Sequence, residues 1–301
     1  MMTTTSRGQS ITVVRTRRSN TARAARILGR VLLYALATAL AAVFMGPFFW
    51  TLGSSLKSTI EIRAYPPLFW PAEPLFSNYA KTFELVPFAM FYQNTIQVTL
   101  LGVLGQTVSA TLVAYGFSRF RFPGRDVLFM LLISTLMLPR EVIVIPTFIL
   151  FKTLGWLDTL MPLWVPAWFA GAFYVFLLRQ FFVTLPRDID EAARIDGANS
   201  LTILTRIILP LSMPAMVSAA IFAFLYYWND FFEPLIYLNK EQNFTLALGL
   251  RYLQTLPNAD QEPRDQYLMA ASLIVAVPCV IVFFVAQRYF VRGIVMSGIK
   301  G

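Results

Sequence analysis

The sequence has no histidine and a single cysteine, Cys279, which lies inside an apolar run. These absences exclude an intrachain disulfide, a zinc site built from several cysteines and a catalytic triad that depends on histidine. A phosphate-binding loop ending in Gly-Lys-Ser/Thr is missing as well, because no glycine in the chain is followed by lysine. We therefore predict that the chain is not an enzyme, does not hydrolyse ATP by that route and holds no metal or cofactor of its own.

Charged residues are also scarce. They make up 14% of the 301 residues, whereas a typical soluble domain has about 25%. Several stretches of about 20 residues carry no charge, which is long enough to cross a hydrocarbon layer of roughly 30 Å. The sequence therefore predicts an all-α integral membrane protein, with six spans at about 28–53, 92–117, 127–149, 160–182, 208–228 and 267–290.

The charges that are present indicate the topology. The formal net charge is +9, and most of the 25 Lys and Arg lie in the N-terminal tail, in the turn at 118–125, in the segment 179–206 and near the C-terminus. Six spans put both termini on one side, and the excess of basic residues places that side in the cytoplasm. We therefore expect contact with membrane lipid and none with nucleic acid. The predicted regions are a mobile cytoplasmic tail at 1–27, a membrane domain at 28–290 and a cytoplasmic tail at 291–301.

The centres of the predicted spans lack ionisable side chains. Arg140 and Glu141 lie in a discontinuity that Pro139 and Pro146 bracket, and this discontinuity can be a hinge or an ordinary helix end. Transporters coupled to protons or sodium usually place ionisable groups at those depths. Their absence counts against a self-powered transporter. If the chain takes part in driven transport, we expect the energy to arrive from a partner on the cytoplasmic side.

One charged segment, "EAARIDGANSLTILTRIILP", stands between two apolar runs and extends from Glu191 to Pro210. Its spacing predicts two short helices at an angle, over about residues 187–204 and outside the bilayer. Such a stiff element can transmit a push from a partner. An ordinary amphipathic cytoplasmic loop is the alternative reading.

Individual residues in this segment have predicted structural roles. Asp188 suits a helix start, because acidic groups favour the positive end of the helix dipole. Asp190 is spaced to pair with Arg194 on the same helix. Gly197 suits a left-handed residue that closes this helix, and Asn199 can cap the next one.

Seven positions of the segment follow a known pattern: Glu-Ala-Ala, three residues, Gly, nine residues, Ile, one residue, Leu-Pro. The pattern resembles the cytoplasmic signature of the membrane subunits of ATP-binding-cassette (ABC) importers. Asp196 and Ala198 give the form common in carbohydrate importers, whereas Leu204 stands where such subunits often have Phe. The residues that the resemblance assigns to ATPase coupling are Glu191, Ala192, Ala193, Asp196, Gly197, Ala198, Leu204, Ile207, Leu209 and Pro210.

The resemblance covers nearly all of residues 28–301, and within it the chain is similar to the second membrane subunit of maltose-permease type. The stretches that carry it, in chain order, are "SNYAKTF" (77–83), "NTIQVTL" (94–100), "AYGFSRFRFPGR" (114–125), "LPREVIVIP" (138–146), "WNDFFEPLIYL" (228–238) and the C-terminal "GIKG".

This resemblance implies a six-transmembrane-helix type I importer permease (MetI-like) fold with cytoplasmic coupling helices. It implies one half of a sugar path, driven by two separate ATPase subunits that bind ATP and Mg. A second homologous permease subunit and an extracytoplasmic sugar-binding protein are the other expected partners, in a bacterial or archaeal cytoplasmic membrane. A polyol or a glycerol phosphoester as the solute, and less readily a stand-alone channel, are the alternatives.

Polar and aromatic residues inside the spans are candidates for the translocation path, because sugars need hydrogen-bonding groups and stack on aromatic rings. Gln106 and Thr107 can either line a path or join helices by hydrogen bonds. The candidates named for the path are Asn94, Gln97, Tyr226, Trp228, Asn229 and Asp230. The aromatic members at 226–228 can instead form a belt at the membrane interface.

Overall fold

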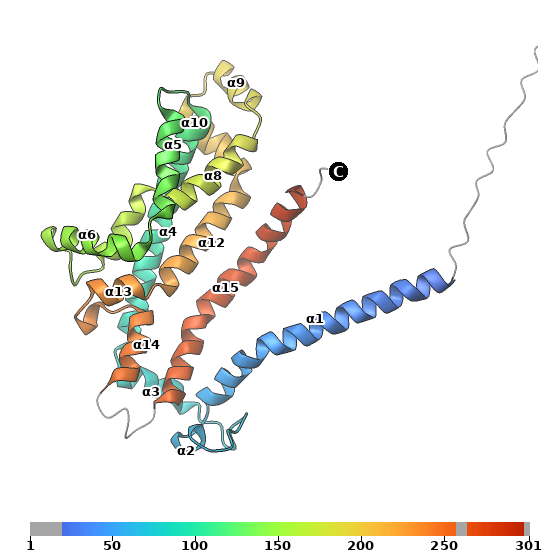
Figure 1. Cartoon of the computed structure of the whole chain (residues 1–301), viewed down its shortest axis with the longest axis vertical. Helices are drawn as coiled ribbons and strands as arrows, with labels where there is room; N and C mark the ends of the chain where they lie inside the picture. The colour runs from blue at the N-terminus through green and yellow to red at the C-terminus, as the bar shows by residue number, and fades with distance from the viewer. Residues whose placement is uncertain (1–19, 257–263, 298–301) are drawn as a thin grey trace, which may run out of the picture. The chain divides into compact units, whose positions relative to one another are not determined.

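The computed structural model describes residues 20–256 and 264–297, and in these ranges it contains helices and loops but no β-strand (Figure 1). The all-α prediction is confirmed. Two units follow one another along the chain, Met1–Trp50 and Thr51–Gly301, and every site described below lies in the second.

The first half of the chain forms α1 (Asn20–Ser55), α2 (Thr59–Ile62), α3 (Ser77–Leu85), α4 (Phe88–Arg119), α5 (Arg125–Ser134), the 3₁₀ turn η1 (Thr135–Met137) and α6 (Arg140–Thr153). The second half forms α7 (Met161–Trp164), the 3₁₀ turn η2 (Val165–Phe169), α8 (Ala172–Thr184), α9 (Asp188–Ile195), α10 (Ser200–Ile203), the π-helical turn η3 (Leu204–Ile208), α11 (Leu209–Leu211), α12 (Met213–Asn229), α13 (Phe232–Tyr237), η4 (Glu241–Asn243), α14 (Leu246–Thr255) and α15 (Asp265–Ser297). The helices α1 and α15 extend into the predicted tails, whose residues 1–19 and 298–301 lie outside the described part of the chain.

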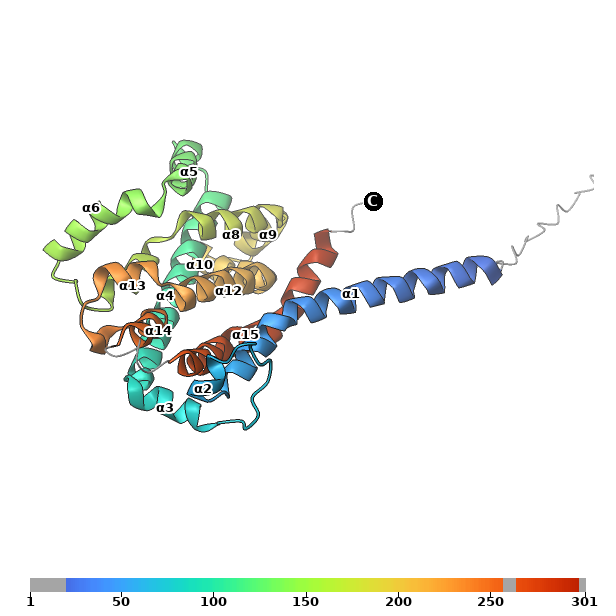
Figure 2. The ribbon, with the colours of Figure 1, turned by 60° about the horizontal axis from the view of Figure 1, so that its bottom comes forward.

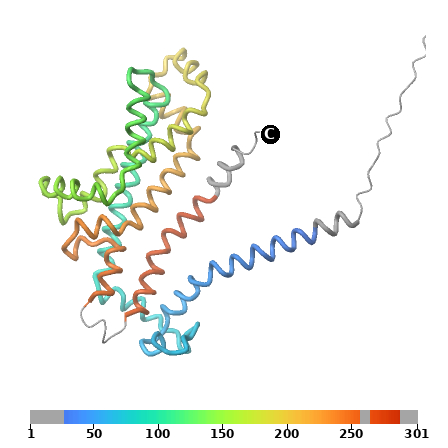
Figure 3. Tube along the Cα trace, viewed as in Figure 1, coloured from blue at the N-terminus to red at the C-terminus, as the bar shows by residue number. Residues whose placement is uncertain are grey.

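Four stretches are long and apolar enough to cross a membrane: Ile27–Ser55, Phe88–Arg119, Met161–Thr184 and Asp265–Gln287. Two further candidates are bent pairs, which can be followed in Figure 3. In the first, α5 and η1 meet α6 at 101°; in the second, the helices from Ser200 to Leu211 meet α12 at 82°. Counting each bent pair as one span gives the predicted six.

The predicted break between Pro139 and Pro146 lies at the first of these prolines. Leu138 is extended, as residues before proline prefer to be, and α6 starts directly after Pro139. Pro146 lies inside α6. Arg140 is therefore the first residue of a helix that turns across the bundle.

The unbroken helix α4 packs against α8, η2 and α12, and Figures 1 and 2 both show these helices together. Small residues permit the close contact. Ala110 and Ala114 are fully buried, and a Cβ added at Gly105 would lie 2.4 Å from the ring of Trp168. The same addition at Gly102 would meet Tyr227 at 2.8 Å. Small residues at helix interfaces are typical of membrane bundles, where close packing replaces the hydrophobic effect as the driving force.

The two ends of this bundle differ. The short helices α9 and α10 lie at one end, whereas α3 and α14 lie at the other (Figure 1). The charged segment is thus separated from α3 and α14 by the length of the bundle (Figure 1).

Asp158 joins two loops beside the bundle. It adopts a left-handed conformation (φ 60°), and its backbone N–H donates to the carbonyl oxygen of Tyr237 at 2.8 Å. Its carboxylate accepts hydrogen bonds from the backbone N–H groups of Asn239 (3.0 Å) and Lys240 (2.8 Å), and the Lys240 ammonium lies 3.1 Å away. Desolvation alone would raise the pKa of Asp158, but these hydrogen bonds outweigh it and lower the pKa to about 2.

We predict that Asp158→Asn lowers the melting temperature of the purified protein by about 3 °C at pH 7. Asn tolerates the left-handed conformation, so the change removes the charge and little else. Because the pKa is depressed on folding, the stabilisation is complete above the unfolded value of about 4 and is lost as the pH falls through 2. The difference between the two proteins should therefore shrink in acid. The exposed Asp188→Asn serves as a control; an equal effect there would contradict the prediction.

Candidate functional site

The segment 187–204, which we name the corner segment, begins with α9. Acidic residues, Glu191 among them, occupy the first turn of this helix, where the helix dipole favours negative charge. The helix ends at Gly197, which has φ 84°. The N–H of Gly197 donates to the carbonyl oxygen of Arg194 at 3.0 Å, and the N–H of Ala198 donates to the carbonyl oxygen of Ala193 at 2.9 Å. The predicted left-handed helix end is confirmed.

The second arm of the corner segment starts at Asn199, whose side chain accepts a hydrogen bond from the N–H of Thr202 at 2.8 Å. This confirms the predicted cap. A π-helical turn, Leu204–Ile208, then leads into α11. Pro210 has no N–H to offer the carbonyl of Arg206, so a regular α-helical turn would lack one hydrogen bond at this point.

The two faces of the corner segment are different. Ala193, Ile203 and Leu204 are buried in one cluster with α4 and α8. The opposite face is solvent-exposed and carries Ile195, which is 87% exposed, and Leu201, which is 64% exposed. Within residues 187–204 these are the two large apolar side chains that are exposed.

The residues predicted for ATPase coupling fall on both faces. Ala193 and Leu204 are buried, and Ala198, Ile207 and Leu209 pack half-buried against the same core. The exposed members are Glu191, Ala192, Asp196, Gly197 and Pro210. The sequence reasoning missed Ile195 and Leu201, although each is an apolar residue directly beside a helix end.

Asp190 does not form the predicted pair with Arg194. Its Oδ2 lies 3.2 Å from Nε of Arg119, at the end of α4. The Arg119 Nη1 also donates to the carbonyl oxygen of Leu185 at 3.2 Å. Spacing along one helix cannot reveal such a partner, because Arg119 comes from a distant part of the chain.

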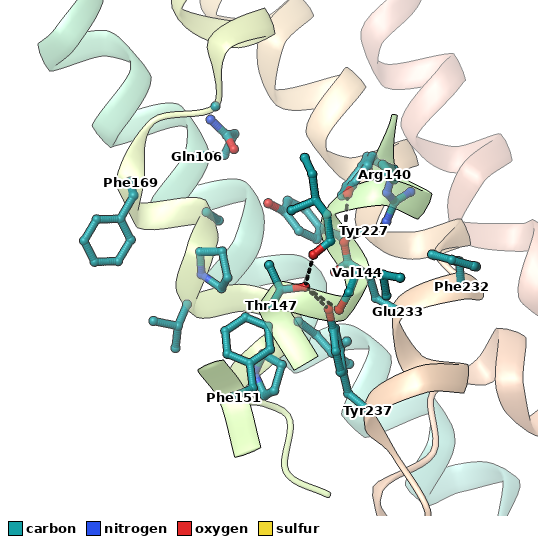
Figure 4. Close-up of a pocket in the computed structure, with 18 of the residues that line it drawn as sticks. Gln106, Arg140, Val144, Thr147, Phe151, Phe169, Tyr227, Phe232, Glu233 and Tyr237 are labelled. Atoms are coloured by element: carbon teal, nitrogen blue, oxygen red, sulfur yellow. Dashed lines mark hydrogen bonds and ion pairs between the residues drawn. The ribbon is translucent and has the colours of Figure 1, made fainter. Parts of the chain in front are cut away.

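A cavity of about 680 Å³ lies further along the bundle, between α4, α6, η2, α8, α12 and α13 (Figure 4). Aromatic and aliphatic side chains form most of its wall, among them Phe173, Tyr226 and Tyr227. Thr147 and Tyr237 share a hydrogen bond of 2.9 Å at this wall. The size and composition are typical of a site for a small organic molecule.

Arg140 is held by two carboxylates at the edge of the cavity. Its Nη2 lies 2.7 Å from Oε1 of Glu233 and 3.4 Å from Oδ1 of Asp230, and its guanidinium lies over the Tyr226 ring at 5.0 Å. Two acids against one base leave this cluster with a formal negative charge. Among the residues that line the cavity, Arg140 is the one basic side chain.

Gln106 gives the cavity a second polar group. It lies in the middle of α4, is 4% exposed, and its Nε2 has no hydrogen-bond partner. The amide packs against Gly171, where an added Cβ would lie 3.0 Å from Oε1. At this point the chain breaks between η2 and α8, and Ala170 has φ 57°. An unpaired amide beside the free N–H groups of a helix start can receive a ligand hydroxyl.

The residues predicted for the translocation path do not meet at one place. Tyr226 lines the cavity, and Asp230 lies at its edge through Arg140. Asn94 donates to carbonyl oxygens of the loop before α14, and Trp228 is buried with its Nε1 on the carbonyl oxygen of Val275. Asn229 donates to Leu225 within its own helix, and Gln97 is exposed on α4 outside the cavity lining.

We predict that Gly197→Ala costs about 1 kcal/mol of local stability, because a left-handed residue with a Cβ is strained. Nothing lies within 4 Å of the added atom, so the cost is conformational alone. Tryptic cleavage after Arg194 should accelerate accordingly. Gly197→Asn, which tolerates this conformation better, should have a smaller effect, and equal rates for all three proteins would contradict the strain.

Comparison with known proteins gives a consistent set of similarities. Residues 106–296 match the family model described as binding-protein-dependent transport system inner membrane component. The chain is 32% identical to the inner membrane ABC transporter permease protein YcjP of Escherichia coli (strain K12), over 92% of this chain and 98% of that protein. It is 33% identical to the sn-glycerol-3-phosphate transport system permease protein UgpE of Rhizobium meliloti (strain 1021), over 83% of this chain and 90% of that protein.

Solved structures show the same architecture. A chain from the crystal structure of a bacterial ABC transporter involved in the import of the acidic polysaccharide alginate matches with a TM-score of 0.77 and 26% identity. The match covers 89% of this chain and 98% of that chain. A chain from the complex of the alginate ABC transporter with an alginate pentasaccharide-bound periplasmic protein shares the fold, with a TM-score of 0.62 and 15% identity.

Proposed function

Because the chain belongs to the family of binding-protein-dependent transport system inner membrane components and is the permease subunit of an ABC importer, we propose that its corner segment is the element that receives the ATPase subunit. The observation that carries this proposal is the exposed apolar tip, Ile195 and Leu201, on a segment whose other face is buried. Acidic Glu191 and Asp196 surround the tip and suit basic groups on a partner.

The assembly we propose contains this chain, a second homologous permease subunit, two ATPase subunits and an extracytoplasmic binding protein. Both termini and the corner segment lie in the cytoplasm in this arrangement, as the distribution of basic residues supports. The chain is an inner membrane component, with residues 28–290 as its membrane domain and 1–27 and 291–301 as its cytoplasmic tails. ATP and Mg bind to the ATPase subunits alone.

For the solute we propose a neutral sugar or polyol. The cavity offers aromatic faces, an unpaired amide nitrogen at Gln106 and a cluster in which two carboxylates, Asp230 and Glu233, outnumber Arg140. A phosphoester or an acidic saccharide would meet an excess of negative charge there. The relatives named for sn-glycerol-3-phosphate keep that phosphoester as the second candidate.

We predict that Ile195→Asp abolishes retention of the ATPase subunit. The buried apolar contact would be replaced by a desolvated charge, and the affinity should fall at least tenfold. The measurement is co-purification of the complex expressed from the chain and its neighbouring genes. Ile60→Asp is a matched control, because Ile60 is 85% exposed and lies in a different helix, α2. Full retention by Ile195→Asp would refute the docking face.

We predict that the co-expressed importer takes up a neutral disaccharide from a panel of maltose, trehalose and sucrose in preference to glycerol 3-phosphate. Gln106→Leu should raise the KM for that uptake about tenfold, because one hydrogen bond to a solute hydroxyl is lost. Gln180→Leu is the matched control: Gln180 is exposed on α8 and does not line the cavity. Preference for glycerol 3-phosphate would refute the proposal of a neutral solute. An unchanged KM in Gln106→Leu would refute the proposed hydrogen bond between Gln106 and the solute.

A further inference from the structure

The cytoplasmic end of α4 holds the corner segment at three separate points. Arg119 Nη1 donates to the carbonyl oxygen of Leu185, ahead of α9, at 3.2 Å. Arg119 Nε lies 3.2 Å from Asp190 Oδ2, inside α9. One turn earlier on α4, the Tyr115 hydroxyl donates to the carbonyl oxygen of Ser200, at the start of α10, at 3.1 Å. One helical turn therefore contacts both arms of the corner.

The ion pair in this contact is deeply buried. The side chains of Arg119 and Asp190 are 2% and 8% exposed. Arg119 Nη2 and Asp190 Oδ1 have no hydrogen-bond partner, and the Nε–Oδ2 approach is an ion pair rather than an aligned hydrogen bond. Burying two incompletely satisfied charges is a poor way to gain stability, and apolar replacements of such pairs are often neutral or better. A role in fixing geometry explains the pair more directly.

The covalent connections of the corner segment are weaker routes for a push. Towards α8 the chain passes through Leu185, which is extended. Towards α12 it passes through a π-helical turn and an 82° bend. By contrast, α4 is one unbroken helix of 32 residues that carries Gln106, about 20 Å from Arg119 at the usual rise per residue.

We propose that Arg119 and Asp190 are positioning residues that clamp the corner segment to α4, so that a displacement of the corner moves α4 as a rod. The wall of the cavity at Gln106 then moves with the corner. This inference rests on the proposed role of the corner segment as the receiver of the ATPase, and it identifies the helix through which that push enters the membrane.

A distance measurement tests the clamp. In a Cys279→Ser background, Leu112→Cys on α4 and Arg187→Cys at the start of α9 place two spin labels at exposed positions, away from Ile195. The complex with its ATPase subunits is measured by pulsed electron resonance with and without vanadate-trapped nucleotide. We expect one narrow distance distribution that trapping does not change. A change of the mean distance on trapping in this parent protein would overturn the clamp.

The variant Asp190→Asn should broaden this distribution while the ATPase still co-purifies. Uptake of the disaccharide panel should fall about tenfold relative to ATP hydrolysis, which is the size of a typical coupling between sites. Asp188→Asn, the same change at an exposed position of the same helix, should leave the distance distribution narrow. An Asp190→Asn protein with a narrow distribution and full uptake would refute the proposal.

A second variant covers the case in which Asp190→Asn does not fold. Arg119→Lys keeps the charge, but a single ammonium cannot serve Asp190 and the Leu185 carbonyl in the way that a guanidinium does. We expect Arg119→Lys to broaden the distance distribution less than Asp190→Asn does. An unbroadened distribution would refute the clamp. Co-purification of the ATPase with Ile195→Asp tests the docking role, whereas the distance distribution tests the clamp. The two proposals can therefore be rejected separately.

Discussion

A hydrocarbon layer offers no water to the backbone, so every N–H and C=O group inside it must find a partner within the protein. This constraint determines where the helices of this chain can break. At the break between η2 and α8, the N–H of Ala170 donates to the hydroxyl of Ser109 on α4, at 3.1 Å, and that hydroxyl lies 3.0 Å from the carbonyl oxygen of Ala167. A single serine of an intact helix thus supports the interrupted one. Gly171 and Ala172, which follow this break, line the cavity.

The helix α4 carries both a residue of the cavity wall and the contacts to the corner segment. In its middle, α4 supports the broken helix and presents Gln106 to the cavity. At its C-terminal end it contacts the corner segment through Tyr115 and Arg119. The cavity carries a charge cluster with one more acid than base, and the corner segment has exposed apolar side chains, so the proposed solute contact and the proposed energy input are separated along α4.

Local features of the fold were predictable from the sequence, because they depend on neighbouring residues. Gly197 and Asn199 have the predicted conformations, since turn and cap chemistry acts over a few residues. The apolar runs likewise predicted the spans. The pairing of Asp190 with Arg119 was not predictable, because it depends on how α9 docks on α4. For the same reason the sequence could not show which members of the coupling motif face the core.

The π-helical turn at Leu204–Ile208 has one more residue between its bonded groups than an α-helical turn. Each residue of an α-helix rotates the chain by about 100°. Removing one residue from this turn would therefore redirect α9 and α10 by roughly a quarter of a circle about the axis leading into α12. The single surplus residue therefore sets the direction in which the exposed side chains of the corner segment point.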